Sequence, residues 1–140
     1  MLDIKLKTSE LTVEEQDAIS IGFALDTKEK DAPEYVSLKL NWLAYDENKL
    51  VGALTANLLW DWIYIDELWI DRIIQNRGFG KALITKVEDY AKENNINGLW
   101  LWTQSWQAEG FYKKLGYEEF TRFPNFPNSH SRIGLRKILQ

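Results

Sequence analysis

Two glycines and two basic residues stand close together in the stretch QNRGFGKALI, residues 75–84. The stretch lies where a polar loop gives way to an apolar run with helical spacing. The first amides of a helix have no partner within the helix, and the helix dipole places partial positive charge there. Gly78 and Gly80 leave such amides accessible to an anion, while Arg77 and Lys81 supply positive charge. The stretch therefore predicts a phosphate-binding loop, with a simple turn into a surface helix as the alternative.

Two common nucleotide-binding motifs are excluded by single residues of this loop. A dinucleotide fingerprint requires a third glycine, and position 83 is Leu83. A Walker A loop requires Ser or Thr after Gly-Lys, and Lys81 is followed by Ala82. A phosphate on this loop must therefore belong to another kind of ligand.

The hydrophobic pattern predicts the elements around the loop. The predicted strands are residues 4–6, 36–46, 49–60, 62–71, 99–102 (buried on both faces), 117–123 and 131–139. The predicted helices are residues 13–25, a helix from Phe79 to the breaker cluster at 94–98 with Glu88 among its polar positions, and residues 107–116. This order predicts an α/β (mixed α+β) single domain over residues 1–140, with a central mixed, mostly antiparallel sheet of about six to seven strands flanked by helices.

Composition excludes several kinds of chemistry. The chain has no cysteine and one histidine, so thiolate catalysis and disulfides are excluded and we expect no metal site. Its net charge of −4 argues against nucleic acid as a partner. Because no segment reads as a signal peptide or a membrane span, we expect no membrane association and a cytoplasmic location.

Two motifs together resemble the GCN5-related N-acetyltransferase (GNAT) superfamily. The stretch YIDELWIDRIIQNRGFGKALI contains Gln-x-x-Gly-x-Gly from Gln75 to Gly80 and resembles the superfamily's acetyl-coenzyme A binding motif. The stretch SWQAEGFYKKLGYEEF, with Ala108, Tyr112 and Gly116, resembles the second motif. The resemblance spans essentially the whole chain and implies the GNAT fold, with acetyl-coenzyme A (acetyl-CoA) as co-substrate.

The resemblance also implies which residues hold the donor. The pyrophosphate is expected on the loop, and the pantetheine arm is expected to pair with the backbone at the end of the third β segment. Ser105 stands where many members have an asparagine that contacts the cofactor. The implied binding residues are Leu68, Trp69, Ile70, Gln75, Asn76, Arg77, Gly78, Phe79, Gly80, Lys81 and Ser105. Asn76 replaces a usual glycine, and asparagine tolerates left-handed backbone geometry.

Catalytic roles follow from the same resemblance. Tyr112 matches the tyrosine that acts as general acid, and its alternative is a core tyrosine. Asp66 and Glu67 are candidates for the base, with a water chain as a further alternative. Strand alternation sends these two carboxylates to opposite faces, and a bulge would change that assignment.

The expected activity is acetyl transfer from acetyl-CoA to a primary amine of a small molecule or peptide. A non-catalytic acyl-CoA binding module is the first alternative, and a small interaction domain is the second. The acceptor stays open among polyamines, aminoglycosides, amino-acid amines and protein N-termini, and a homodimer stays open too. Trp60, Trp62 and Trp106 form either a cleft for an organic cation or part of the core, and His130 is either a loop residue or an acceptor-site residue.

Overall fold

The computed structural model describes residues 1–140, which form two compact units, Met1–Tyr35 and Val36–Gln140. The first unit contains helix α1, Val13–Glu29. Thr12 accepts a hydrogen bond from the Glu15 amide, and the Glu15 carboxylate accepts one from the Thr12 amide. This capping box satisfies orphan amides at the helix start, and α1 begins at Val13, where the sequence predicts a helix to begin. The prediction of one domain over residues 1–140 stays a prediction.

The strand predicted at residues 4–6 is wrong, because residues 1–12 contain no helix or strand. Two alternating apolar residues indicate a local preference only. A strand also requires hydrogen bonds to a partner strand, which a local pattern does not specify.

The second unit is built on one six-stranded sheet with the order β1-β2-β3-β4-β6-β5. Its elements are β1 Ser37–Asp46, β2 Lys49–Leu59, β3 Trp62–Ile70, the short 3-10 helix η1 Arg72–Ile74, α2 Phe79–Glu93, β4 Gly98–Gln104, α3 Glu109–Lys114, β5 Glu118–Pro124 and β6 Ser131–Ile138. Only β3 and β4 pair in parallel, and all other neighbours are antiparallel. The predicted fold class is confirmed.

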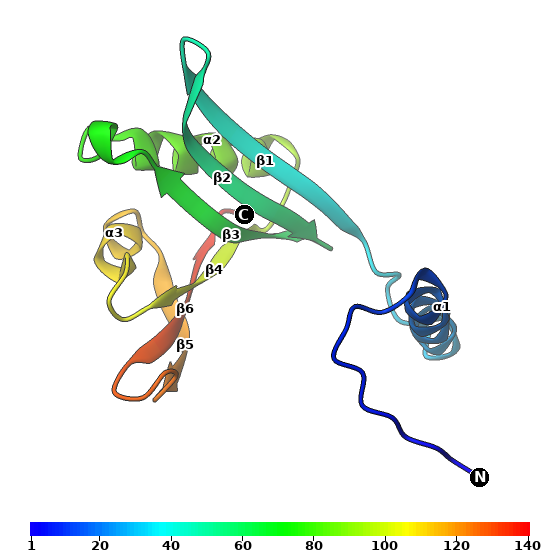
Figure 1. Cartoon of the computed structure of the whole chain (residues 1–140). Coiled ribbons are helices and arrows are strands. Elements are labelled where there is room, and N and C mark those ends of the chain that lie inside the picture. Colours follow the sequence, from blue (N-terminus) through cyan, green and yellow to red (C-terminus); the bar gives the residue numbers. More distant parts are fainter. The chain divides into compact units, whose positions relative to one another are not determined.

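The core lies between one face of the sheet and α2, which contacts β1, β2, β3 and β4 (Figure 1). Leu54, Ile63, Leu99 and Leu135 of the sheet are completely buried. Burying a leucine or isoleucine side chain contributes roughly 1.5–3 kcal/mol relative to leaving it exposed. This core fixes the start of α2 against the ends of the central strands.

Strand β4 differs from its predicted environment. Leu99 and Leu101 are buried, whereas Trp100 and Trp102 are half-buried. The prediction that residues 99–102 are buried on both faces is therefore wrong. Tryptophan is apolar enough to occupy a partly exposed face, so an unbroken apolar run did not reveal the alternation.

No helix has the length and apolar character that crossing a membrane requires.

Candidate donor and catalytic site

The parallel pairing in the centre of the sheet is short. It joins Trp62–Ile65 of β3 to Gly98–Leu101 of β4, although β3 continues to Ile70 and β4 to Gln104. Figure 1 shows the two strands diverging beyond these pairs. Residues 67–70 of β3 therefore pair with β2 on one edge, and residues 66–70 present an unpaired backbone edge toward β4.

A run of backbone amides without acceptors precedes and begins α2. Residues 76–81 donate to no group within the chain, and the first helical bond runs from the Ala82 amide to the Gly78 carbonyl at 3.0 Å. Asn76 and Gly78 both have left-handed backbone conformations, with φ of 64° and 84°. Alternating backbone geometry of this kind forms a concave nest of N–H groups that favours an anion. We call residues 76–81 the amide loop.

The amide loop is anchored to the end of β3. The Gln75 side-chain amide donates to the Ile70 carbonyl at 3.0 Å. Just before the loop, the Asp71 carboxylate accepts from the Ile73 amide at 3.1 Å and lies 3.8 Å from the Lys49 ammonium. These contacts hold the loop beside the unpaired edge of β3.

The charges on the amide loop favour an anion. The first turn of α2 has no acidic residue. Arg77 and Lys81 are exposed, and no carboxylate oxygen lies within 4.0 Å of either side-chain nitrogen. Two cations without an internal partner remain available to a polyanion.

The two loop glycines serve different purposes. A Cβ on Gly78 would meet nothing within 4 Å, so the positive φ is what requires glycine there. A Cβ on Gly80 would approach the Phe111 ring to 3.3 Å and a Leu68 methyl to 4.0 Å. Gly80 therefore permits Phe111 of α3 to pack closely against the start of α2, which its sequence interpretation as an opening for phosphate did not include.

Tyr112 is 5% exposed on α3. Its ring packs edge-on against Phe111 at 5.1 Å and against Tyr117 at 5.6 Å between centroids. Its hydroxyl makes no hydrogen bond within the chain. Gln104 Oε1 is the one fully buried side-chain oxygen or nitrogen without a hydrogen-bond partner, so the Tyr112 hydroxyl oxygen retains some exposure to solvent. Burial raises the pKa of Tyr112 to about 12. Tyr112 is thus a neutral donor with a free, partly accessible hydroxyl.

A β-bulge decides the positions of the two carboxylates. Thr55 of β2 faces Glu67 and Ala56 faces Ile65, so Asp66 has no opposite residue. Opposed residues share a face, and the Thr55 hydroxyl donates to Glu67 Oε1 at 3.0 Å. Glu67 therefore lies on the face away from α2, whereas simple alternation from buried Ile65 would place it on the α2 face.

Asp66 lies near Tyr64, which is on that same outer face. Burial raises the pKa of Tyr64, the charge of Asp66 raises it further, and Arg132 opposes the change. Both carboxylates are exposed. The bulge therefore brings Asp66 and Glu67 toward one side of the sheet instead of separating them.

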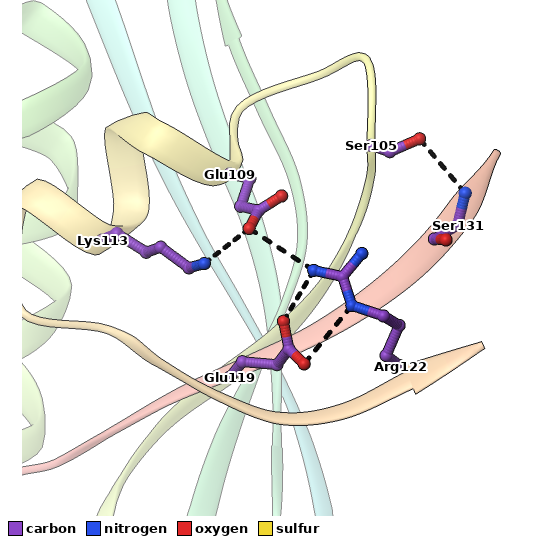
Figure 2. Close-up of polar contacts among 6 residues, drawn as sticks. All are labelled: Ser105, Glu109, Lys113, Glu119, Arg122 and Ser131. Carbon is purple, nitrogen blue, oxygen red and sulfur yellow. Dashed lines mark hydrogen bonds and ion pairs between the residues drawn. The ribbon is translucent and has the colours of Figure 1, made fainter. Parts of the chain in front are cut away.

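Ser105 is engaged with β6. Its hydroxyl accepts from the Ser131 amide at 3.1 Å (Figure 2), and its own amide donates to the Ser131 carbonyl at 2.8 Å. Figure 2 also shows that Glu109 at the start of α3 contacts Lys113 and, at 3.6 Å, Arg122 of β5. These contacts join α3 to the C-terminal strands, and contact of Ser105 with a cofactor stays a prediction.

The three tryptophans considered for a cleft do not meet. Trp60 and Trp62 line an open groove of about 360 Å³ at the beginning of β3 and β4, together with Leu59, Asp61, Trp100, Phe120 and Arg136. Trp106 follows the other end of β4 and packs edge-on against His130, with ring centroids 4.8 Å apart. An organic-cation cleft formed by all three is therefore not present.

Sequence reasoning missed one residue near the site. Glu88 was assigned to the polar positions of its helix, but it is only 9% exposed. It follows Ile84 by four residues and precedes Ala91 by three, and both are buried. That spacing places Glu88 on the apolar stripe and was a usable signal.

Comparisons with known proteins find related sequences. Residues 7–117 match the model of the acetyltransferase (GNAT) family. Blasticidin-S acetyltransferase from Streptomyces morookaense is 32% identical over 83 residues, which cover 59% of this chain and 61% of that protein. The chain spans between 34% and 61% of the length of four curated relatives that it matches.

Solved structures are similar as well. An acetyltransferase from Bacillus cereus ATCC 14579 superposes with a TM-score of 0.80 at 25% identity, covering 96% of this chain and 98% of that one. A putative streptothricin acetyltransferase from Bacillus anthracis, solved in complex with acetyl coenzyme A, gives a TM-score of 0.65 at 25% identity, covering 71% of this chain and 62% of that one.

Proposed function

Because the chain belongs to the acetyltransferase (GNAT) family, we propose that it transfers an acetyl group from acetyl-CoA to a primary amine of a small molecule or peptide. The resemblance inferred from the two sequence motifs is confirmed by the family match. The acceptor and the roles of individual residues belong to the proposal.

The amide loop is the observation that carries the proposal. Six consecutive amides without acceptors, at the start of a helix and flanked by Arg77 and Lys81, suit the pyrophosphate of coenzyme A. The amides supply preorganised donors and the two side chains supply charge. Residues 76–81 are therefore the proposed pyrophosphate site.

The unpaired edge of β3 suits the rest of the donor. The pantetheine arm contains amide groups, which pair with backbone N–H and C=O groups in the manner of an added strand. Leu68, Trp69 and Ile70 lie on the part of β3 that has no partner on the β4 side. In this placement the thioester lies where β3 and β4 begin to diverge.

Tyr112 is the proposed general acid. In the transfer, the amine nitrogen forms a bond to the acetyl carbon, the carbon–sulfur bond breaks, and the thiolate takes a proton. Since burial raises the pKa of Tyr112 to about 12, its hydroxyl stays protonated at neutral pH. An ordinary thiol has a pKa of roughly 8.5, so complete proton transfer from Tyr112 to the thiolate is unfavourable by itself. Tyr112 therefore donates a hydrogen bond to the sulfur while the carbon–sulfur bond breaks, and the proton that passes to the thiolate is replaced on the phenol from water.

Asp66, Glu67 or a water chain is the proposed base that removes the proton from the amine. The shared outer face of the two carboxylates supports an approach of the ammonium form from that side. The same carboxylates attract a cationic acceptor.

Calorimetric titration with acetyl-CoA tests the donor site. We expect saturable binding by the wild type and its loss in Gly78→Glu, because a carboxylate would then occupy the amide loop. Gly22→Glu is the matched control, since a Cβ at Gly22 also meets nothing within 4 Å and Gly22 lies in α1. Equal affinity of the wild type and Gly78→Glu would refute the assignment.

An amine panel scored by release of free thiol tests the activity. The panel contains blasticidin S, streptothricin, spermidine, kanamycin, lysine and an alanine-initiated peptide. Release with at least one amine, and a loss of turnover in Tyr112→Phe that exceeds its loss of acetyl-CoA affinity, is the expected result. Tight acetyl-CoA binding without thiol release over the panel would favour a non-catalytic binding module.

A further inference from the structure

Glu88 carries a carboxylate inside the core, where an unpaired charge is very costly. Both of its oxygens are engaged. Oε2 accepts from the Tyr117 hydroxyl at 3.0 Å, and Oε1 accepts from the Lys137 ammonium at 2.9 Å. Glu88 and Tyr117 are buried, and Lys137 is partly buried. We call Glu88, Tyr117 and Lys137 the Glu88 triad.

Lys137 also connects the Glu88 triad to α3. Its ammonium also donates to the Leu115 carbonyl at 2.8 Å, at the C-terminal cap of that helix. The ammonium lies 5.7 Å from the centre of the Tyr117 ring. One lysine therefore joins β6, the carboxylate on α2 and the end of α3.

Two backbone hydrogen bonds and one ring contact connect the Glu88 triad to Tyr112. The Tyr117 amide donates to the Tyr112 carbonyl at 3.1 Å, and the Leu115 amide donates to the same carbonyl at 3.0 Å. The Tyr117 ring also packs against the Tyr112 ring. Because the Tyr112 hydroxyl has no hydrogen bond within the chain, its position depends on these backbone and ring contacts.

Packing alone does not account for this ion pair, in which the Glu88 side chain is 11% exposed and the Lys137 side chain is 28% exposed. An ion pair withdrawn from water generally stabilises a protein no better than apolar side chains of similar volume. It does specify the geometry of the three side chains, because each hydrogen bond in the triad has a defined donor and acceptor. Burial and the nearby Glu88 carboxylate raise the pKa of Tyr117, so its hydroxyl persists as a donor.

We propose that Glu88, Tyr117 and Lys137 are positioning residues that hold Tyr112 in place for acetyl transfer. This inference rests on the proposed function. The triad does not touch the reacting atoms but fixes the helix end and the ring that carry the hydroxyl. A misplacement of about 1 Å costs on the order of 100-fold in rate.

The test introduces Lys137→Met into the wild type and into Tyr112→Phe. Lys92→Met is the matched control, since Lys92 is exposed and forms no ion pair. Turnover is measured as thiol release with the best amine of the panel above, and acetyl-CoA affinity is measured by calorimetry. In the wild type we expect roughly a 10- to 100-fold loss of turnover, with affinity changed less than about threefold.

In the Tyr112→Phe background we expect Lys137→Met to lower turnover less than about twofold, because the group that it positions is already absent. An equal fold loss in both backgrounds would mean that Lys137 supports the fold in general, and it would overturn the inference.

Tyr117→Phe provides a second variant in case Lys137→Met does not fold. It removes the hydroxyl that reaches Glu88 and keeps the ring beside Tyr112. We expect a severalfold loss of turnover in the wild type and none in Tyr112→Phe, and equal losses would again contradict positioning. A wild type without thiol release would refute the proposed function itself, a result distinct from equal losses in an active enzyme.

Discussion

The burial of Tyr112 makes a prediction about stability in alkali. The folded-state pKa is raised from 10.0 to about 12, so the unfolded chain loses this proton at lower pH than the folded chain. The stability contributed by the neutral buried phenol is therefore fully present below pH 10 and is lost as pH rises through 12. Tyr112→Phe removes this titration.

The magnitude follows from the two pKa values. At pH 11, about ten unfolded phenols are ionised for each neutral one, and the folded state has the inverse ratio. Relative to pH 8, the folding equilibrium constant of the wild type should therefore fall roughly tenfold through Tyr112, or about 1.4 kcal/mol, and the variant should not show this loss.

Urea unfolding followed by tryptophan fluorescence at pH 8, 9, 10 and 11 measures this difference. The matched control is Tyr45→Phe, because Tyr45 is 59% exposed. The free energy of unfolding of Tyr112→Phe should rise relative to wild type from pH 8 to pH 11 by more than that of the control. An unchanged difference across the series would refute the burial of the Tyr112 phenol.

Four further substitutions test the packing, the loop and the base. Gly98→Ala should lower the melting temperature measured by circular dichroism, at a cost of about 1–3 kcal/mol, because the added Cβ would lie 2.3 Å from the Lys137 carbonyl oxygen. Gly78→Ala should weaken acetyl-CoA binding in calorimetry, since its φ of 84° disfavours any side chain; unchanged affinity would argue against the amide loop. Asp66→Asn and Glu67→Gln, compared by their pH–rate profiles, should identify the base by loss of the acidic limb in one of them. Retention of that limb in both would indicate water.

Much of the fold could be predicted because its signals are local. The hairpin of β1 and β2 follows from two apolar runs with a polar turn between them, and α2 follows from its helical spacing. The start of α1 was visible in Thr12 and Glu15, whose capping box requires only neighbouring residues.

The remaining features depend on contacts that are distant in sequence. The bulge at Asp66 results from the register between β2 and β3, so the strand's own alternation gives the wrong face for Glu67. Residues 4–6 carried a strand pattern without specifying a partner. Within α2, local spacing could have placed Glu88 on the apolar stripe, but its partners, Tyr117 and Lys137, could not be predicted because they lie 29 and 49 residues away.

The short pairing between β3 and β4 has a consequence for the folded state as a whole. Four residue pairs join the β1-β2-β3 half of the sheet to the β4-β6-β5 half. A ligand that pairs with residues 66–70 would act as a piece of secondary structure and extend this seam between the halves. Saturating acetyl-CoA should then slow amide hydrogen exchange along the seam and raise the melting temperature by mass action. In this protein the donor would be both a reactant and a structural member of the sheet.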